Sequence, residues 1–269
     1  MKTVLITGGT SGIGRELANI YKNEGYQVYA VGLDPNPLDK NEYFCDVTNI
    51  NSIQNIADKF EHLDLLICSA GFGISGSLEL TGADIAKKLF DVNYFGVLNT
   101  CQVCLPKIQK HSKIIVIGSC CGLFALPFRA HYCASKSAIN MFANGLRMEL
   151  SKTDIDVTVV NPGDVKTEFI QNRIKNFETN ERYQNRVKNA QEVVESKNDK
   201  RMSVKFCARK IFKICKKKNL KASYIIGFKY KVLNFFAKIM PKNIFLNITN
   251  KFMGGMWYKN FFCLDYWKI

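Results

Sequence analysis

Short runs of Val, Ile and Leu alternate along this chain with longer amphipathic segments. The short runs are apolar on both faces, a pattern typical of parallel strands that helices cover on both sides. Alternation of strands and helices builds right-handed βαβ units. The sequence therefore predicts an α/β fold with a doubly wound, mostly seven-stranded parallel sheet and helices on both faces. The expected strands are residues 3–7, 27–33, 42–45, 64–68, 113–118, 155–160 and 222–227. The expected helices are residues 13–24, 50–60, 83–109 with a break, 131–151 and 204–217.

The net charge lies in the last part of the chain. The formal charge is +15 over 269 residues, and residues 201–269 hold 16 Lys or Arg against one acid, Asp265. Residues 1–200 are therefore neutral overall. A basic region of this kind suggests an anionic partner, such as a membrane surface or a nucleic acid.

Nothing in the sequence indicates export or a membrane span. The first residues run straight into an expected strand, which is too short and wrongly flanked for a signal peptide. No uninterrupted apolar run of about 18 residues occurs. We therefore expect a cytoplasmic protein whose ten Cys are free thiols, and we expect no metal.

A glycine-rich turn, residues 7–14, follows the first expected strand and opens the first expected helix. Glycine permits a tight turn and a close approach of backbone N–H groups to a pyrophosphate, and the helix N-terminus adds partial positive charge. Asp34 lies 20 residues after Gly14, where an acid binds an adenosine ribose. The segment predicts a Rossmann-like dinucleotide site in preference to a simple tight loop. The expected contacts are Gly8, Ser11, Gly12, Ile13, Gly14 and Asp34.

Four polar side chains form a second pattern. Tyr132 and Lys136 are four residues apart in an expected helix, so they share one face. An ammonium beside the phenol would lower its pKa from about 10. Such pairs also arise by chance on helix surfaces, but Ser119 follows an expected strand at the edge where open α/β sheets bind ligands. Asn93 lies beyond the strand 64–68 and would face the same edge. These residues predict a hydride-transfer site beside a bound dinucleotide.

Taken together, these motifs resemble the short-chain dehydrogenase/reductase family from about residue 2 to residue 169. Residues 7–14 match T-G-x-x-x-G-x-G, residues 132–136 match Y-x-x-x-K, and Ser119 precedes Tyr132 by the usual thirteen residues. The remaining matches are Cys45-Asp46-Val47, Cys68-Ser69-Ala70-Gly71 in place of N-N-A-G, Asp91-Val92-Asn93, and residues 161–167 as the P-G-x-x-x-T loop.

The resemblance implies a role for each residue. Tyr132 would exchange a proton with the substrate oxygen, and Ser119 would stabilise the charge on that oxygen. Lys136 would lower the pKa of Tyr132 and hold the nicotinamide ribose, while Asn93 would position a water. The cofactor would carry the hydride. The cofactor contacts implied besides the glycine turn are Asp34, Asp46, Val47, Ala70, Gly71, Tyr132, Lys136, Val165 and Thr167.

The sequence departs from the family pattern in two places. Cys68 and Ser69 replace two Asn, so they cannot supply the usual amide hydrogen bonds. Gly32 occupies the position where NAD-using members carry an acid, and Asp34 falls two residues later. No basic residue offers itself to a 2′-phosphate, which Asp34 would repel. We therefore expect NAD, with NADP as the alternative.

The substrate side of the expected site is apolar. Residues 122–128 lie between Ser119 and Tyr132, where the resemblance implies a loop that lines the substrate pocket. With Phe72 and Phe169, this loop favours a lipophilic alcohol or ketone such as a steroid, retinoid or acyl derivative. Apolar packing under the helix would give the same composition, so a sugar or other polar substrate stays open.

The C-terminal extension, residues 229–269, is basic and aromatic. Residues 230–240 predict an amphipathic helix that ends at Pro241, and residues 253–269 add two Trp. One interpretation packs this helix on the body or on a partner copy. The other places it on an anionic membrane surface as a peripheral anchor. Nucleic acid is disfavoured because no recognition motif accompanies the charge.

The sequence thus predicts two parts: a Rossmann-like NAD(P)-binding and catalytic domain over residues 1–228, and the extension. Residues 168–201 would form a polar excursion over the substrate. The expected function is NAD(P)-dependent hydride transfer on a secondary alcohol or ketone, in a homodimer or homotetramer built on the helix of Tyr132 and on residues 94–109. The alternatives are an NAD(P)-binding sensor or scaffold without turnover, and a membrane-surface binding protein.

Overall fold

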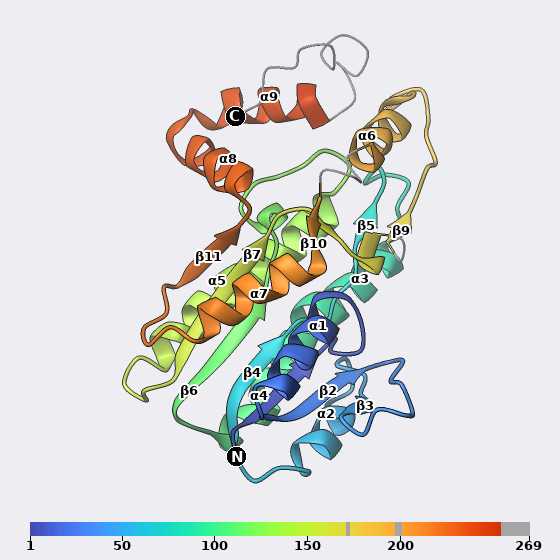
Figure 1. The fold of residues 1–269 in the computed structure, drawn as a ribbon. Coiled ribbons are helices and arrows are strands. Elements are labelled where there is room, and N and C mark those ends of the chain that lie inside the picture. Colours follow the sequence, from blue (N-terminus) through green and yellow to red (C-terminus); the bar gives the residue numbers. More distant parts are fainter. Residues whose placement is uncertain (171–172, 197–200, 254–269) are drawn as a thin grey trace.

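A seven-stranded parallel sheet forms the centre of the molecule, which confirms the predicted fold class. The computed structural model describes residues 1–170, 173–196 and 201–253. The strand order is β11-β7-β6-β4-β1-β2-β3, so the chain winds outward from β1 in both directions (Figure 1). The strands are β1 (Thr3–Thr7), β2 (Gln27–Gly32), β3 (Glu42–Phe44), β4 (Leu63–Cys68), β6 (Ile108–Ile117), β7 (Asp156–Pro162) and β11 (Ser223–Ile226).

Two apolar cores cover the two faces of the sheet. Val4 and Ile6 of β1 belong to one core, whereas Leu5 between them belongs to the other, because successive side chains of a strand point to opposite faces. On the first face, α1 (Gly12–Asn23) and α7 (Val204–Cys215) lie side by side (Figure 1). The helices of the second face are α2 (Ile50–Ala57), α4 (Gly96–Cys104) and α5 (Ala130–Glu149).

The helix expected over residues 83–109 is broken, as predicted, and it ends earlier than expected. It consists of α3 (Ala83–Phe90), a π-helical turn (Asp91–Phe95) and α4. A 3-10 turn with Pro106 follows, since proline lacks the N–H that would continue the helix, and β6 begins at Ile108. The π turn places Asn93 in the interior, where it is fully buried.

The excursion over residues 168–201 is tied to the body by two short parallel pairs. β5 (Ile74–Ser75) pairs with β9 (Ile174–Lys175), and β8 (Val165–Lys166) pairs with β10 (Met202–Ser203). Between β9 and β10 lies α6, and one face of that helix is buried, although the sequence suggested a solvated segment. Residues 171–172 and 197–200 lie outside the described part. α6 spans Arg186–Glu195 and buries Val187, Ala190, Gln191 and Val193.

The predicted C-terminal amphipathic helix is present as α8 (Phe228–Ile239), and α9 (Lys242–Met253) follows Pro241. None of the residues of α8 is buried, whereas α9 buries Phe245 and Thr249. α8 therefore does not pack its apolar side on the described body. Among the described helices, none has the length and apolar character needed to cross a membrane. The aromatic segment 254–269 lies outside the described residues.

Candidate active site

A cavity of about 310 Å³ opens at the carboxyl edge of the sheet. It is bounded by the glycine turn after β1, the segment after β4, the end of β6, the start of α5 and the loop after β7. Open α/β sheets bind ligands at this edge because the strand ends leave a crevice there. The cavity brings together most of the residues that the sequence predicts: Gly8, Ser11, Gly12, Ile13, Ala70, Gly71, Ser119, Tyr132, Lys136, Val165 and Thr167.

The Tyr132 phenol lies at the start of α5 and is 7% exposed. Burial raises its pKa, because the phenolate loses its hydration, and the nearby Cys121 thiol raises it further. A hydrogen bond with the Ser119 side chain acts in the opposite direction. The phenol therefore holds its proton at neutral pH in the protein alone.

Lys136 lies one turn after Tyr132 and is 5% exposed. Its Nζ donates to the Ile117 carbonyl oxygen at 3.2 Å. Burial lowers the pKa of Lys136 to about 8, since the ammonium is costly to desolvate. The sequence led us to expect that Lys136 lowers the pKa of Tyr132. Instead, burial of the phenol outweighs any effect of Lys136, and the pKa of Tyr132 is raised.

The position of Ser119 is fixed by Asn161, a fully buried residue at the end of β7. Asn161 Oδ1 accepts from the Ser119 backbone N–H at 2.9 Å, and its Nδ2 donates to Asn140 Oδ1 at 3.0 Å. The Ser119 hydroxyl in turn accepts from the Cys121 N–H at 3.1 Å. With its oxygen already accepting one bond, the hydroxyl is oriented to donate.

Asn93 does not line the cavity but lies directly behind it. Its Nδ2 donates to the Phe72 carbonyl at 3.0 Å and to Ser135 Oγ at 3.1 Å, and its Oδ1 accepts from the Phe72 N–H at 3.0 Å. A Cβ atom on Gly71 would lie 2.9 Å from Asn93 Oδ1 and 3.6 Å from Lys136 Nζ. Asn93 thus secures the segment after β4 close to Lys136.

The glycine turn has the shape of a phosphate cradle. Gly8 and Gly12 have φ angles of 65° and 49°, which L side chains rarely adopt. A Cβ on Gly14 would lie 2.1 Å from the Gly8 carbonyl oxygen, so only glycine fits beneath the turn. Ser11 is the N-cap of α1 and makes no side-chain cap hydrogen bond, which leaves the first N–H groups of the helix for a ligand. These features fit the pyrophosphate of a dinucleotide.

Three predicted adenosine contacts lie apart from this cavity as the described residues define it. Asp34 is exposed just beyond β2. Asp46 accepts from the Thr48 N–H at 2.9 Å, and Val47 is buried against Gly96, whose added Cβ would lie 2.6 Å from Val47 Cγ2. Asp34, Asp46 and Val47 therefore remain predictions as cofactor contacts.

Among the charged or reactive cavity residues that the sequence reasoning missed are Arg129, Arg173 and Cys121. A hydrogen bond from the Cys133 thiol and the charge of Arg129 lower the pKa of Cys121 to about 7, against the effect of burial. Arg129 stands one residue beyond the apolar loop 122–128, so its place before the Tyr132 helix was a usable signal. Arg173 comes from the excursion, and nothing local in the sequence connects it with this site.

Comparisons with known proteins agree with this geometry. A family model described as short chain dehydrogenase matches residues 2–178. A probable short-chain type dehydrogenase/reductase, VdlC of Helicobacter pylori, is 34% identical over 252 residues, which cover 89% of this chain and 93% of that protein. A 3-ketodihydrosphingosine reductase of Bacteroides thetaiotaomicron is 35% identical over 63% of this chain and 66% of its own length. The structure of a short-chain dehydrogenase of Burkholderia cenocepacia in complex with NADP superimposes with a TM-score of 0.72 at 21% identity, covering 92% and 99% of the two chains.

We expect Gly14→Ala to weaken dinucleotide binding by at least about tenfold, because its methyl group would collide with the Gly8 carbonyl and distort the cradle. Titration of NAD and NADP by calorimetry measures the loss. Gly145→Ala in α5 is the matched control, since its methyl group would meet no atom within 4 Å. Equal affinities in the two variants would contradict the cradle.

We expect Lys136→Met to raise the free energy of unfolding near pH 7 by roughly 3 kcal/mol, since the charged ammonium is buried at a cost of about 1.4 kcal/mol per pKa unit. The pKa is lowered from 10.5 to about 8 on folding, so the unfolded chain binds more protons between these values. The cost in the wild type is therefore present below pH 8 and is lost as the pH rises to 10.5. Urea unfolding should show the gap between variant and wild type closing over this range, and a gap independent of pH would refute the assignment.

Proposed function

The chain belongs to the short-chain dehydrogenase family of NAD(P)-dependent oxidoreductases, and from that premise we propose that it transfers a hydride between a nicotinamide cofactor and a secondary alcohol or ketone with a large apolar group. One observation carries the proposal: Ser119, Tyr132 and Lys136 line the same cavity as the glycine turn. A sensor that binds a dinucleotide without turnover would need none of these three side chains.

In the proposed mechanism, Tyr132 is the general acid for a carbonyl substrate. Its raised pKa keeps the phenol protonated, so the proton is available to the substrate oxygen as negative charge develops there. Ser119 donates a hydrogen bond to the same oxygen and stabilises that charge. When bound, the nicotinamide cofactor supplies or accepts the hydride. In the reverse direction, Tyr132 accepts the proton of the alcohol.

Lys136 replaces the proton that Tyr132 gives up. Because the pKa of Lys136 is about 8, its ammonium releases a proton more readily than a solvated lysine does near neutral pH. The buried amide of Asn93 holds the backbone of Phe72, next to Gly71, whose added Cβ would lie 3.6 Å from Lys136 Nζ. We therefore propose that Asn93 positions a water on the proton path, and that the second lone pair of its Oδ1 accepts a hydrogen bond from that water.

NAD is the proposed cofactor, and NADP is the alternative. Asp34 is exposed beyond the end of β2, where it can accept from a ribose hydroxyl and would repel a 2′-phosphate. Arg15, the first basic residue of α1, forms an ion pair with Glu42 at 3.7 Å and so does not offer itself freely to a 2′-phosphate. The Burkholderia cenocepacia dehydrogenase was solved in complex with NADP, which supports the alternative, so both cofactors belong in every assay.

We expect Tyr132→Phe to lower kcat by about 10²- to 10⁴-fold, the usual contribution of a positioned general acid. Binding of NAD or NADP should change less than about twofold, because the phenyl ring still fills the site. The assay follows reduced nicotinamide with a panel of lipophilic and polar ketones, with Tyr43→Phe on β3 as the control. A variant that retains full activity would favour the sensor interpretation.

We also propose that α8 binds an anionic membrane surface. Phe228, Phe235 and Ile239 are 81%, 57% and 59% exposed and follow one side of the helix, opposite to the half-buried Tyr230. Lys231 and Lys238 are exposed beside this apolar stripe. Aromatic and aliphatic side chains flanked by lysines suit the boundary between acyl chains and anionic head groups.

Vesicle sedimentation tests the role of α8. We expect the chain to pellet with phosphatidylglycerol vesicles, to pellet poorly with phosphatidylcholine vesicles, and to be released by salt. Phe235→Ser with Ile239→Ser should abolish pelleting, whereas the change Leu38→Ser, at an exposed residue outside α4, α5 and α8, should not. Failure to pellet, together with a lower mass in solution for the double variant, would instead make α8 a contact between copies.

A homodimer or homotetramer stays a proposal that two exposed residues of α5 support. Met141 and Met148 are 73% and 72% exposed on that helix, and Phe95 before α4 is 47% exposed. These side chains would be covered by a second copy that packs against α4 and α5. The mass in solution tests this arrangement independently of α8.

A further inference from the structure

Two arginine side chains line the cavity beside Tyr132. Arg129 is the residue before α5, and Arg173 is the residue before β9. Both line the cavity, and the charge of each acts on the Tyr132 phenol and favours its phenolate. The two guanidinium groups therefore belong to the end of the cavity where a substrate would react.

Neither arginine forms an ion pair with a carboxylate within the described residues. Arg129 is 7% exposed, and its guanidinium takes part in none of the ion pairs or side-chain hydrogen bonds found there. The Nε and Nη1 atoms of Arg173 are buried without any hydrogen-bond partner. Burial, and then the charge of Arg129, lower the pKa of Arg173 to about 10, so Arg173 stays charged at neutral pH.

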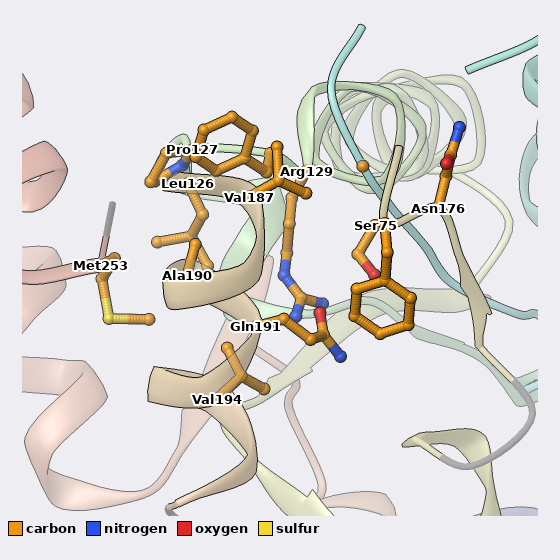
Figure 2. Close-up of a pocket in the computed structure, with 13 residues that line it drawn as sticks. Ser75, Leu126, Pro127, Arg129, Asn176, Val187, Ala190, Gln191, Val194 and Met253 are labelled. Atoms are coloured by element: carbon orange, nitrogen blue, oxygen red, sulfur yellow. The ribbon is translucent and has the colours of Figure 1, made fainter. Parts of the chain in front are cut away.

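The acids near this pair are either bound to other groups or exposed. Figure 2 shows Arg129 reaching from its loop toward Gln191 on α6. The Gln191 amide donates to Glu195, which also accepts from Lys175 Nζ at 2.9 Å. Asp164 lies within electrostatic range of Arg173 but makes its side-chain hydrogen bond with Tyr230. Glu168 lines the rim and is exposed.

Two unpaired buried cations of like charge are unfavourable unless an anion joins them. A guanidinium presents parallel N–H groups that match a carboxylate or phosphate, and low local polarity strengthens such contacts. We infer that Arg129 and Arg173 bind an anionic head group, a carboxylate or phosphate, on the substrate itself. The inference rests on the proposed function, because it assigns the charge of the molecule that Tyr132 and Ser119 act on.

The rest of the lining fits the other part of such a substrate. Phe169 packs against Tyr132 with ring centroids 5.8 Å apart, and Phe72, Leu126, Val194 and Met253 line the same cavity. An apolar chain would lie on these side chains while the head group meets the arginines. The substrate class is therefore an amphiphilic keto or hydroxy compound with one anionic group, rather than a neutral steroid or retinoid.

Binding of three amphiphiles that share one chain tests this inference without turnover. Calorimetry with the full chain would compare dodecanoate and dodecyl phosphate below their micelle concentrations with dodecanol below its solubility limit, and with inorganic phosphate as a separate probe. We expect either anionic amphiphile to bind about 10- to 100-fold more tightly than dodecanol, the usual effect of charge-assisted hydrogen bonds. Inorganic phosphate binding as tightly as dodecyl phosphate would show a site for the free ion and overturn the assignment to a substrate.

Arg173→Gln and Arg129→Gln should each remove most of this preference and leave dodecanol and NAD binding unchanged. Arg182→Gln is the matched control, an arginine of the same excursion with a 75% exposed side chain that pairs with Glu79. Because an unpaired buried charge destabilises the fold, Arg173→Gln should also keep or raise the Tm. A lower Tm or a variant that fails to fold would show that Arg173 has a structural partner, and unchanged head-group preference would equally refute the inference. Neither result bears on the proposed oxidoreductase activity, which the Tyr132→Phe assay tests separately.

Discussion

Parallel pairing of β4, β6 and β7 is the constraint on which the rest of the site depends. Cys68 of β4 is in register with Val116 of β6, and Ile117 of β6 is in register with Val160 of β7. All three strands therefore end at one edge, and the residues that follow them meet there. The hydrogen bond from the Ser119 N–H to Asn161 Oδ1 then fixes one strand end against the next. The geometry of the site is in this sense a consequence of strand register, since Asn93, Ser119 and Asn161 come from separate segments of the chain.

Electrostatics divide the cavity into two ends with different ligands. At the glycine turn, positive character comes from the uncapped N-terminus of α1, a partial charge suited to a pyrophosphate. At the other end it comes from the full charges of Arg129 and Arg173. Between them lie a phenol whose pKa is raised and an ammonium whose pKa is lowered, both because of burial. Burial thus makes the phenol hold its proton more tightly than in water, and the ammonium less tightly. These two directions suit the proposed transfer of a proton from Lys136 to Tyr132 after Tyr132 has given up its own.

The strands and the main helices could be predicted because both faces of the sheet are buried, so each strand reads as a continuous apolar run. The glycine turn and the Tyr132–Lys136 pair could be predicted because their chemistry depends on local spacing. The direction of the pKa shift of Tyr132 could not, since spacing in a helix says nothing of how deeply the phenol is buried. Arg129 and Arg173 are 44 residues apart, and they meet only because β9 pairs with β5. That α8 leaves its apolar side uncovered is likewise a tertiary property, because an amphipathic pattern is the same whether or not a partner is present.

α8 packs through Tyr230 against the loop after β7. A Cβ at Gly163 would lie 1.9 Å from the ring of Tyr230, so the tyrosine of α8 occupies the space that a side chain would take in that loop. The next residues, Asp164 and Val165, line the cavity. A side chain at residue 163 would displace either Tyr230 or this loop, so the seating of α8 and the shape of the cavity wall depend on the same glycine.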